Sequence, residues 1–216
     1  MSNRIDSTRF GLIRHAQTHW NLDKLIQGQK DSALTAAGQQ QAQVWGHRLS
    51  SYTSHRFDRI LASDLGRALS TAGWMNQFLQ IPISKRSRLR ELDWGAWTGK
   101  RIRDIQSETP DLLKSMEAAG WHFCPPGGES RQAVRQRAHD ALQDAARKWP
   151  GQTILTVTHE GVIKCLLYGL TQRAFLPQEP AMIAPYHLHW LVVRDGKLLI
   201  ERINALALDQ DTESIR

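Results

Sequence analysis

The sequence predicts an α/β fold, a three-layer α/β/α sandwich with a mostly parallel central sheet and an antiparallel edge. Short apolar runs alternate along the 216 residues with longer segments of helical periodicity, the pattern typical of parallel strands covered on both faces. The last two apolar runs, His187–Val193 and Lys197–Ile203, flank the turn sequence Arg194-Asp195-Gly196. They are therefore predicted to form a hairpin, which supplies the antiparallel edge.

The first half of the chain contains three predicted strands, all short apolar runs. They are Phe10–Ile13, Arg59–Ala62 and Ile81–Ile83. Between the first two, Thr35 can cap a helix whose apolar residues recur at helical spacing as far as Leu49. Ser63 is expected to cap a second helix, which ends near Leu79.

The second half begins with a glycine-punctuated loop, from Leu89 to Gly99, and ends in the hairpin. Between them the sequence predicts short helices at 102–107 and 110–119, a break at 125–128, a long helix at 129–149, a strand at 152–158 and a helix at 161–168. The segment from about 100 to 128 is expected to form a cap over a ligand site. No linker divides the chain, so residues 1–216 are expected to form a single domain.

The composition favours a small anionic partner. Basic residues outnumber acidic ones by 28 to 21, which suits nucleic acid, an anionic membrane surface or a small anion. In the basic cluster from Lys85 to Arg103 aromatic residues do not alternate with the cations, so nucleic acid is not expected. No apolar run could cross a bilayer, and Met1–Phe10 carries no export segment, so we expect a cytoplasmic protein without membrane contact.

Charged and polar residues follow three of the predicted strands. Arg14 and His15 follow the first strand, Arg67 comes soon after the second, and His159 follows the strand at 152–158. The carboxyl ends of strands line the ligand crevice of an open α/β sheet. We therefore expect both histidines and both arginines to converge there.

The residues around these strand ends form an ordered set of motifs. They are Arg14-His15-Ala16-Gln17-Thr18-His19-Trp20-Asn21, Gln27-Gly28, Leu34-Thr35-Ala36-Ala37-Gly38, the ten residues from Ser63 to Ala72, Leu89-Arg90-Glu91-Leu92-Asp93-Trp94-Gly95, Gly127-Gly128-Glu129-Ser130 and Thr158-His159. In this order and spacing the chain resembles the histidine phosphatase superfamily, which includes the cofactor-dependent phosphoglycerate mutases. Within it, the chain most resembles broad-specificity phosphatases and alpha-ribazole phosphatase. The resemblance implies a phosphoglycerate mutase-like sandwich and a phosphomonoester hydrolase.

The resemblance also implies how the phosphoryl group is handled. His15 is the expected nucleophile, which becomes phosphohistidine, and His159 is expected to stabilise the transferring oxygens. Arg14 and Arg67 can hold a phosphate bidentately, and their positive charge lowers the pKa of His15, which keeps the attacking nitrogen neutral. The other expected phosphate contacts are Asn21, Gln27, Gly28 and Glu160.

Two carboxylates compete for the role of proton donor to the leaving group. Glu91 matches the acid of the family, and a nearby phosphate dianion would raise its pKa, although Asp93 could share the role. Glu160 directly follows His159, where many relatives have glycine and one branch has its donor. We expect Glu91 to be the acid and Glu160 to be the alternative.

No metal or other cofactor is expected, because the arginines neutralise the phosphate charge. His187 and His189 alternate on one strand, but no third ligand accompanies them. The expected partner is a small phosphorylated metabolite, and no oligomeric state is predicted. The alternatives are a mutase-type phosphotransferase and a non-catalytic phospho-ligand-binding module. The first is disfavoured because Leu92 and Trp94 replace an arginine and a tyrosine of the mutases. The second is disfavoured because the expected nucleophile and both arginines are present.

Overall fold

A six-stranded sheet with the order β3-β2-β4-β1-β5-β6 forms the centre of the molecule. The computed structural model describes residues 7–52 and 56–209, so most of the N-terminal segment on which export was judged lies outside it. The strands are β1 (Thr8–Arg14), β2 (Arg59–Ser63), β3 (Ile83–Arg86), β4 (Thr153–Thr158), β5 (His187–Arg194) and β6 (Lys197–Ala207). β1 to β4 pair in parallel, whereas β5 and β6 are antiparallel, which confirms the predicted fold class.

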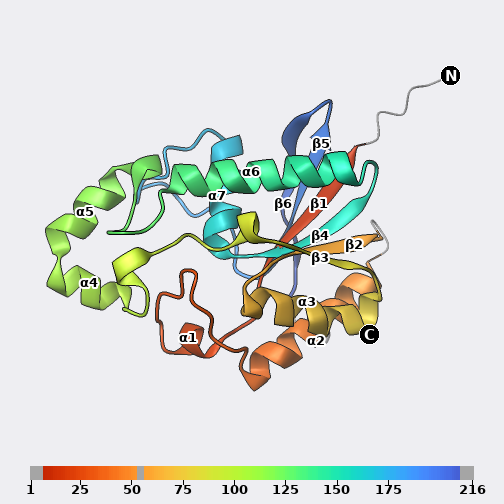
Figure 1. The fold of residues 1–216 in the computed structure, drawn as a ribbon, viewed down its shortest axis with the longest axis horizontal. Helices are drawn as coiled ribbons and strands as arrows, with labels where there is room; N and C mark the ends of the chain where they lie inside the picture. The colour runs from red at the N-terminus through yellow and green to blue at the C-terminus, as the bar shows by residue number, and fades with distance from the viewer. Residues whose placement is uncertain (1–6, 53–55, 210–216) are drawn as a thin grey trace.

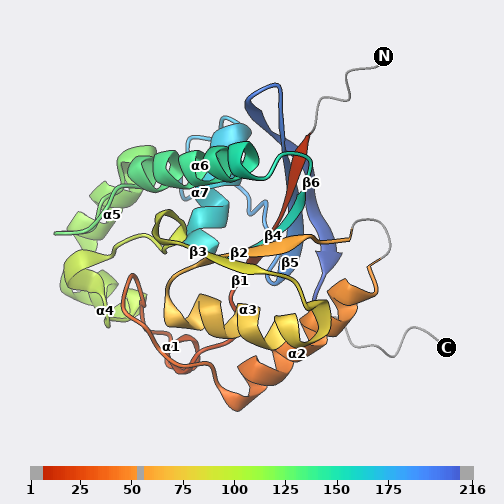
Figure 2. The same ribbon diagram turned by 45° about the vertical axis from the view of Figure 1, so that its right-hand side comes forward.

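Helices cover both faces of this sheet (Figures 1 and 2). Their bounds are α1 (His19–Leu22), α2 (Ala36–Ser50), α3 (Gly66–Leu79), α4 (Ile102–Glu108), α5 (Pro110–Ala118), α6 (Arg131–Lys148) and α7 (Glu160–Leu170). Figure 1 shows α2 and α3 below the sheet, and α6 and α7 above it. The result is the predicted three-layer sandwich, with β1 and β4 in its middle.

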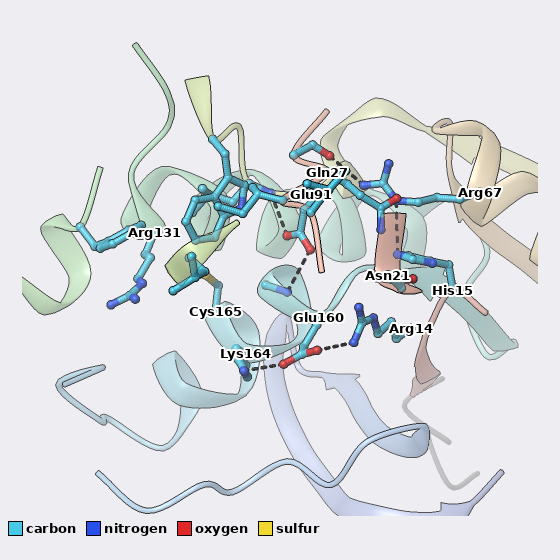
Figure 3. A pocket seen from close by; sticks show the side chains of 18 of the residues that line it. Arg14, His15, Asn21, Gln27, Arg67, Glu91, Arg131, Glu160, Lys164 and Cys165 are labelled. Carbon is cyan, nitrogen blue, oxygen red and sulfur yellow. Dashed lines mark hydrogen bonds and ion pairs between the residues drawn. The ribbon is translucent and has the colours of Figure 1, made fainter. Parts of the chain in front are cut away.

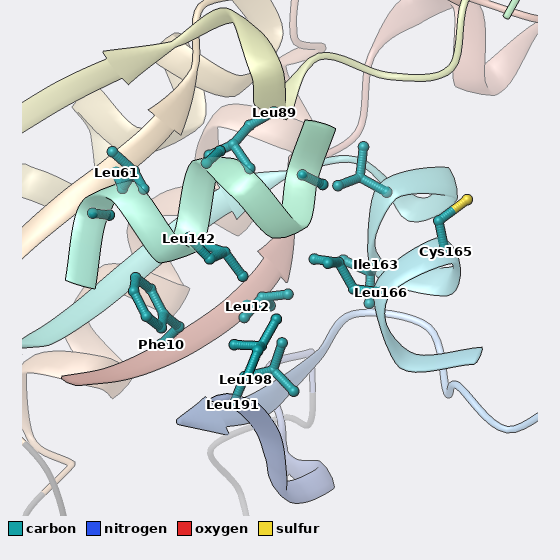
Figure 4. Packing of buried hydrophobic residues seen from close by; sticks show 14 of the residues in the cluster. Phe10, Leu12, Leu61, Leu89, Leu142, Ile163, Cys165, Leu166, Leu191 and Leu198 are labelled. Atoms are coloured by element: carbon teal, nitrogen blue, oxygen red, sulfur yellow. The ribbon is translucent and has the colours of Figure 1, made fainter. Parts of the chain in front are cut away.

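Alternate side chains of β1 enter the two cores on either side of the sheet. Phe10 and Leu12 belong to the cluster shared with α6 and α7 (Figure 4), whereas Ile13 belongs to the cluster shared with α2 and α3. All three side chains are fully buried. Burying each of them contributes about 2 kcal/mol, so this strand is held firmly from both sides. The residues that follow it are thereby fixed in place.

Of the two predicted helix caps, one is confirmed and the other is wrong. Thr35 caps α2, and its hydroxyl accepts the Gly38 N–H at 2.9 Å, as predicted. The prediction that Ser63 caps the next helix was wrong, because Ser63 is the last residue of β2 and Leu65 is the N-cap of α3. The Ser63 hydroxyl lies against His159 instead, at 2.8 Å from its Nε2 atom.

Two other local elements differ from the prediction. The edge strand β3 lies at Ile83–Arg86, later than the predicted 81–83, and Pro82, which lacks an N–H, contributes only its carbonyl, to Ile60. The helical turn α1 was not predicted, because it is only four residues long. It is closed by a capping box, in which Thr18 and Asn21 bond each other's backbone N–H groups.

The segment from 100 to 128 forms a small lobe with its own core. It contains α4, α5 and the 3-10 turn Gly120–His122, which Figure 1 places beside the carboxyl ends of the strands. Ile105, Leu113 and Phe123 from this segment pack with Ile26 and Trp97. In the part of the chain that the structure describes, no helix is long and apolar enough to cross a membrane.

Candidate active site

A cavity of about 440 Å³ lies at the carboxyl ends of the parallel strands (Figure 3). Most of the predicted site residues line it: Arg14, His15, Asn21, Gln27, Gly28, Arg67, Glu91 and Glu160. His159 is fully buried, and its ring centroid is 5.3 Å from that of His15. The expected convergence of both histidines and both arginines is therefore confirmed.

Hydrogen bonds define the tautomer of His15. Its Nδ1 atom is 2.8 Å from the Ala16 carbonyl, which can only accept, so Nδ1 carries the proton. Its Nε2 atom receives the Nε–H of Arg67 at 3.2 Å, and a guanidinium can only donate. Burial, followed by the charges of Arg14 and Arg67, lowers the pKa of His15 well below its usual value. Nε2 is therefore an unprotonated nitrogen, whose electron pair accepts from Arg67 in this structure.

Arg67 is held by the loop that precedes α2. Its guanidinium donates to the carbonyls of Gly28 and Lys30, both at 2.7 Å, and to Asp31 at 3.2 Å. The side chain is buried, so these bonds fix its orientation within the first turn of α3. Gly28 has a φ of +52°, and a Cβ there would lie 3.0 Å from the Thr98 hydroxyl. This close approach explains the glycine of the Gln27-Gly28 motif.

Arg14 belongs to a chain of three charges on the opposite wall of the cavity. Its Nη1 atom donates to Glu160 at 2.5 Å, and the other Glu160 oxygen accepts from Lys164 at 2.5 Å. Burial raises the pKa of Glu160, but Arg14 and Lys164 outweigh it, so the net shift is downward. Glu160 is therefore an ionised carboxylate at neutral pH.

His159 has one bonded ring nitrogen and one without a partner. Nε2 lies 2.8 Å from the Ser63 hydroxyl, whereas Nδ1 is buried and has no hydrogen-bond partner among the described residues. Burial, followed by the charge of Arg67, lowers the pKa of His159 well below its usual value. A buried polar nitrogen without a hydrogen-bond partner is costly, which sets Nδ1 apart from the bonded Nε2.

Glu91 lies where the acid loop passes the start of α7. One of its oxygens accepts the N–H of Leu92 at 2.8 Å, and the other accepts the N–H of Gly161 at 3.3 Å. Burial raises the pKa of Glu91 despite these bonds and the charges of Arg67 and Arg14. A Cβ on Gly161 would lie 2.3 Å from a carboxylate oxygen of Glu91, so a larger residue there would displace that carboxylate.

The loop that carries Glu91 is held by Arg137 of α6. Arg137 donates to the backbone carbonyls of Arg88, Arg90 and Glu91 at 2.6 to 3.0 Å. The same guanidinium donates to both carboxylate oxygens of Glu129, at 2.7 and 2.8 Å. Glu129 belongs to the Gly-Gly-Glu-Ser motif, so that motif supports the position of the acid loop.

Asn21, Gln27 and Asp93 complete the set of predicted polar residues. Asn21 accepts the Thr18 N–H at 3.0 Å through Oδ1, which leaves its amide nitrogen for the cavity that it lines. Gln27 is buried, and its Oε1 atom has no partner within the described residues. Asp93 accepts the Gly95 N–H at 2.9 Å and does not line the cavity, so it does not compete with Glu91 there.

The outer part of the cavity is largely apolar. Its walls include Leu25, Ile26, Leu92, Trp94, Ile102, Phe123 and Phe175. Arg131 lies between Phe123 and Phe175, 4.2 and 4.1 Å from the ring centroids, and donates to backbone carbonyls. Ile102 and Phe123 come from the lobe at 100–128.

The possible metal ligands are occupied by other contacts. His187 Nδ1 lies 2.7 Å from the Pro185 carbonyl, and His189 Nδ1 accepts the Asn204 N–H at 3.1 Å. Across residues 7–52 and 56–209, no group of three His, Cys, Asp or Glu side chains is arranged to hold a metal ion.

The charged residues at the site that were not found from the sequence include Asp31, Arg131 and Lys164. Lys164 could have been found, because it follows Glu160 by four positions, a spacing that pairs opposite charges on a helix; the predicted helix, however, began one residue later, at Gly161. Asp31 and Arg131 gave no such signal, because their partners come from distant parts of the chain.

A parallel α/β sheet with two arginines and two neutral histidines at its carboxyl edge defines an enzyme that handles phosphoryl groups. The chain belongs to the histidine phosphatase superfamily (branch 1), whose sequence model matches residues 10–206.

The proteins to which this chain is similar differ in the activities that their names give. A probable phosphoglycerate mutase, GpmB of Salmonella paratyphi C, is 38% identical over 156 residues, which are 72% of this chain and 71% of that protein. The structure of Bacillus stearothermophilus YhfR superimposes with a TM-score of 0.82 at 31% identity, covering 93% of this chain and 98% of the other. The alpha-ribazole phosphatase of Shigella flexneri gives 0.75 at 27% identity, with 94% and 99% covered.

Proposed function

We propose that this protein hydrolyses phosphomonoesters through a phosphohistidine on His15, without a metal or other cofactor. The observation that carries the proposal is the unprotonated Nε2 atom of His15, which faces the cavity beside the buried guanidinium of Arg67. A neutral nitrogen at a site for anions is the nucleophile that phosphoryl transfer needs.

The first step moves the phosphoryl group to the enzyme. Nε2 of His15 attacks phosphorus, the N–P bond forms, and the bond from phosphorus to the ester oxygen breaks. Glu91 gives its proton to the departing alkoxide, which leaves as an alcohol. In the second step Glu91 takes a proton from water, the hydroxyl oxygen attacks phosphorus, and the N–P bond breaks. Inorganic phosphate leaves and His15 is neutral again.

The phosphoryl group is held by side chains from several elements. Arg14 and Arg67 supply two positive charges to the cavity. His159 supplies a donor through Nδ1, the ring nitrogen that has no partner among the described residues. Asn21 and Gln27 add neutral contacts. Gly28 acts mainly through its carbonyl, which orients Arg67.

Glu91 is the proposed proton donor in preference to Glu160. Its raised pKa favours the protonated form that a general acid needs, whereas Arg14 and Lys164 keep Glu160 ionised. A carboxylate that already binds two cations has no proton to give. Glu160 nevertheless lines the cavity and contacts the substrate side of Arg14.

The proposed substrate is a small phosphorylated metabolite. The apolar outer cavity and the lobe at 100–128 support a leaving group of moderate size that is partly apolar. We propose that residues 1–216 form one catalytic domain with this lobe as its cap, that the protein is cytoplasmic, and that nucleic acid and membranes are not its partners.

A phosphoglycerate mutase activity is the second candidate, because of the similarity to the probable mutase GpmB. Leu92 and Trp94 stand where the resemblance implies carboxylate-binding residues in mutases, and Glu160 adds a negative charge to the cavity. Incubation with 3-phosphoglycerate distinguishes the two. A mutase forms 2-phosphoglycerate, whereas a hydrolase releases phosphate.

The decisive experiment measures hydrolysis of p-nitrophenyl phosphate with a chelator present, by the wild type and by His15→Ala. We expect activity in the wild type and only background in the variant. Wild-type enzyme quenched during turnover of ³²P-labelled substrate should carry alkali-stable, acid-labile label, and the variant none. Loss of wild-type activity to the chelator, or absence of the label, would contradict the proposal. Equal background activity in both proteins would favour a non-catalytic binding module.

A further inference from the structure

One wall of the cavity carries a negative charge close to the proposed phosphate site. Glu160 lines the cavity together with Arg14 and Lys164, and its two oxygens bond one cation each at 2.5 Å (Figure 3). The three side chains are partly exposed, with 26%, 41% and 36% of Arg14, Glu160 and Lys164 accessible. A bound ester would therefore meet this wall directly.

We propose that Glu160 is a specificity-determining residue, which selects against esters whose leaving group carries an anionic group and favours neutral or ammonium-bearing leaving groups. This inference rests on the proposed function, since it concerns the substrate of the same site. It gives Glu160 a role that does not require it to transfer a proton.

The charge balance of this wall determines which leaving groups it favours. Without Glu160, Arg14 and Lys164 would present two uncompensated cations, one for the phosphoryl group and one for a second anion. With Glu160 between them, the wall carries a single net positive charge, and the carboxylate holds Lys164 by an i,i+4 ion pair. That single charge suffices for the phosphoryl group and leaves no second cation for another anion.

The other two arginines near the cavity already donate to protein groups. Arg67 is paired with Asp31, and Arg131 donates to the carbonyls of Gly120 and Phe175 between two aromatic rings. A carboxylate on the leaving group would thus find Lys164 already bonded and the Glu160 carboxylate beside it. A hydroxyl or an ammonium group can instead donate to Glu160.

Three esters with the same two-carbon scaffold test this inference on the full chain. They are 2-hydroxyethyl phosphate, phosphoglycolate and O-phosphoethanolamine, whose leaving groups are neutral, anionic and cationic. The quantity measured is kcat/KM for each ester, expressed relative to 2-hydroxyethyl phosphate, so that a general effect on Arg14 or on folding cancels. The proteins are the wild type, Glu160→Gln, Lys164→Met and, as a matched control, Glu201→Gln. Glu201 lies on β6 outside the cavity, and its carboxylate is paired with Arg9 of β1.

Glu160→Gln should raise the relative kcat/KM for phosphoglycolate by about tenfold and lower that for O-phosphoethanolamine, because it removes one negative charge from the wall. Lys164→Met should change both ratios in the opposite direction, and Glu201→Gln should leave them unchanged. Equal changes for all three esters in Glu160→Gln would overturn the inference.

Binding separates this inference from the proposed function. Dissociation constants of the same three esters are measured by calorimetry with the His15→Ala variant, alone and combined with Glu160→Gln, so that no transfer to His15 consumes the ester. Selective binding without hydrolysis by the wild type would overturn the proposed function and support the charge selection. Hydrolysis by the wild type, with ratios that Glu160→Gln does not alter, would support the proposed function and overturn the charge selection.

Discussion

The Nε2 atom of His159 lies 2.8 Å from the hydroxyl oxygen of Ser63, where β2 and β4 end side by side. Both residues are fully buried. A hydroxyl can donate to Nε2, and in that case the ring proton of a neutral imidazole must be on Nδ1. Nδ1 is the nitrogen without a partner. We propose that Ser63 donates to Nε2 and so holds the tautomer in which Nδ1 can donate to a phosphoryl oxygen.

Ser63→Ala should therefore weaken stabilisation of the transition state more than binding of the substrate. We expect kcat to fall by about fivefold with little change in KM, as for the loss of one hydrogen bond of about 1 kcal/mol. Vanadate, which resembles the transition state, should bind correspondingly more weakly, while phosphate affinity changes little. If Ser63 had only a structural role, thermal stability would fall while the ratio of vanadate to phosphate affinity stayed the same.

The role of Ser63 also shows where prediction from the sequence ends. The strands, the major helices and the strand-end residues His15, Arg67 and His159 were predicted, because each depends on a local pattern or an ordered motif. Ser63 was assigned to a helix cap, which is the common local role of serine before a helix. Its actual partner, His159, is 96 positions away and is reached only once β2 and β4 pair.

The support of the acid loop by Arg137 leads to a second prediction. Glu129→Gln replaces a carboxylate that grips Arg137 through both oxygens, and the amide nitrogen of glutamine cannot accept from the guanidinium. The Arg137 fork should turn and release the carbonyls that it holds, including that of Glu91. We expect kcat for an alkyl phosphate to fall by about tenfold or more, since small displacements of a catalytic group are costly.

Glu201→Gln is the matched control for Glu129→Gln, because its partner Arg9 lies at the opposite end of β1 from the site. It should leave kcat unchanged. Urea unfolding distinguishes a loss of stability from a misplaced acid: a Glu129→Gln protein that is folded, less stable and fully active would contradict the assigned role.

The role of Glu91 as the acid is tested by how the loss of activity in Glu91→Gln depends on the basicity of the leaving group. Glu91→Gln should reduce kcat/KM for an alkyl phosphate by about 100-fold or more, because the alkoxide then leaves without a proton. The kcat/KM for p-nitrophenyl phosphate should fall by less than about tenfold, since p-nitrophenolate is a good leaving group without protonation. This constant covers only the steps up to departure of the alcohol, so it excludes the later role of Glu91 as the base for water. The same comparison on Glu160→Gln should show no dependence on the leaving-group pKa. Equal losses for both esters in Glu91→Gln would contradict its role as the acid.

A buried histidine away from the cavity predicts how stability depends on pH. Burial, followed by the charge of His187, lowers the pKa of His189 from 6.5 to about 4. Its Nδ1 atom accepts the N–H of Asn204, a bond that requires that nitrogen to be unprotonated. The unfolded chain therefore takes up this proton first as the pH falls. Its contribution to stability is present above pH 6.5 and is lost progressively toward pH 4.

His189→Asn isolates this contribution, because the asparagine oxygen can still accept the Asn204 N–H but does not titrate. Between about pH 7 and about pH 5, the wild type should lose about 2 kcal/mol more unfolding free energy than the variant. Urea titrations at the two pH values measure the difference, with exposed His122→Asn as the control that should behave like the wild type. A variant with the same pH dependence as the wild type would mean that His189 titrates alike in the folded and unfolded chains.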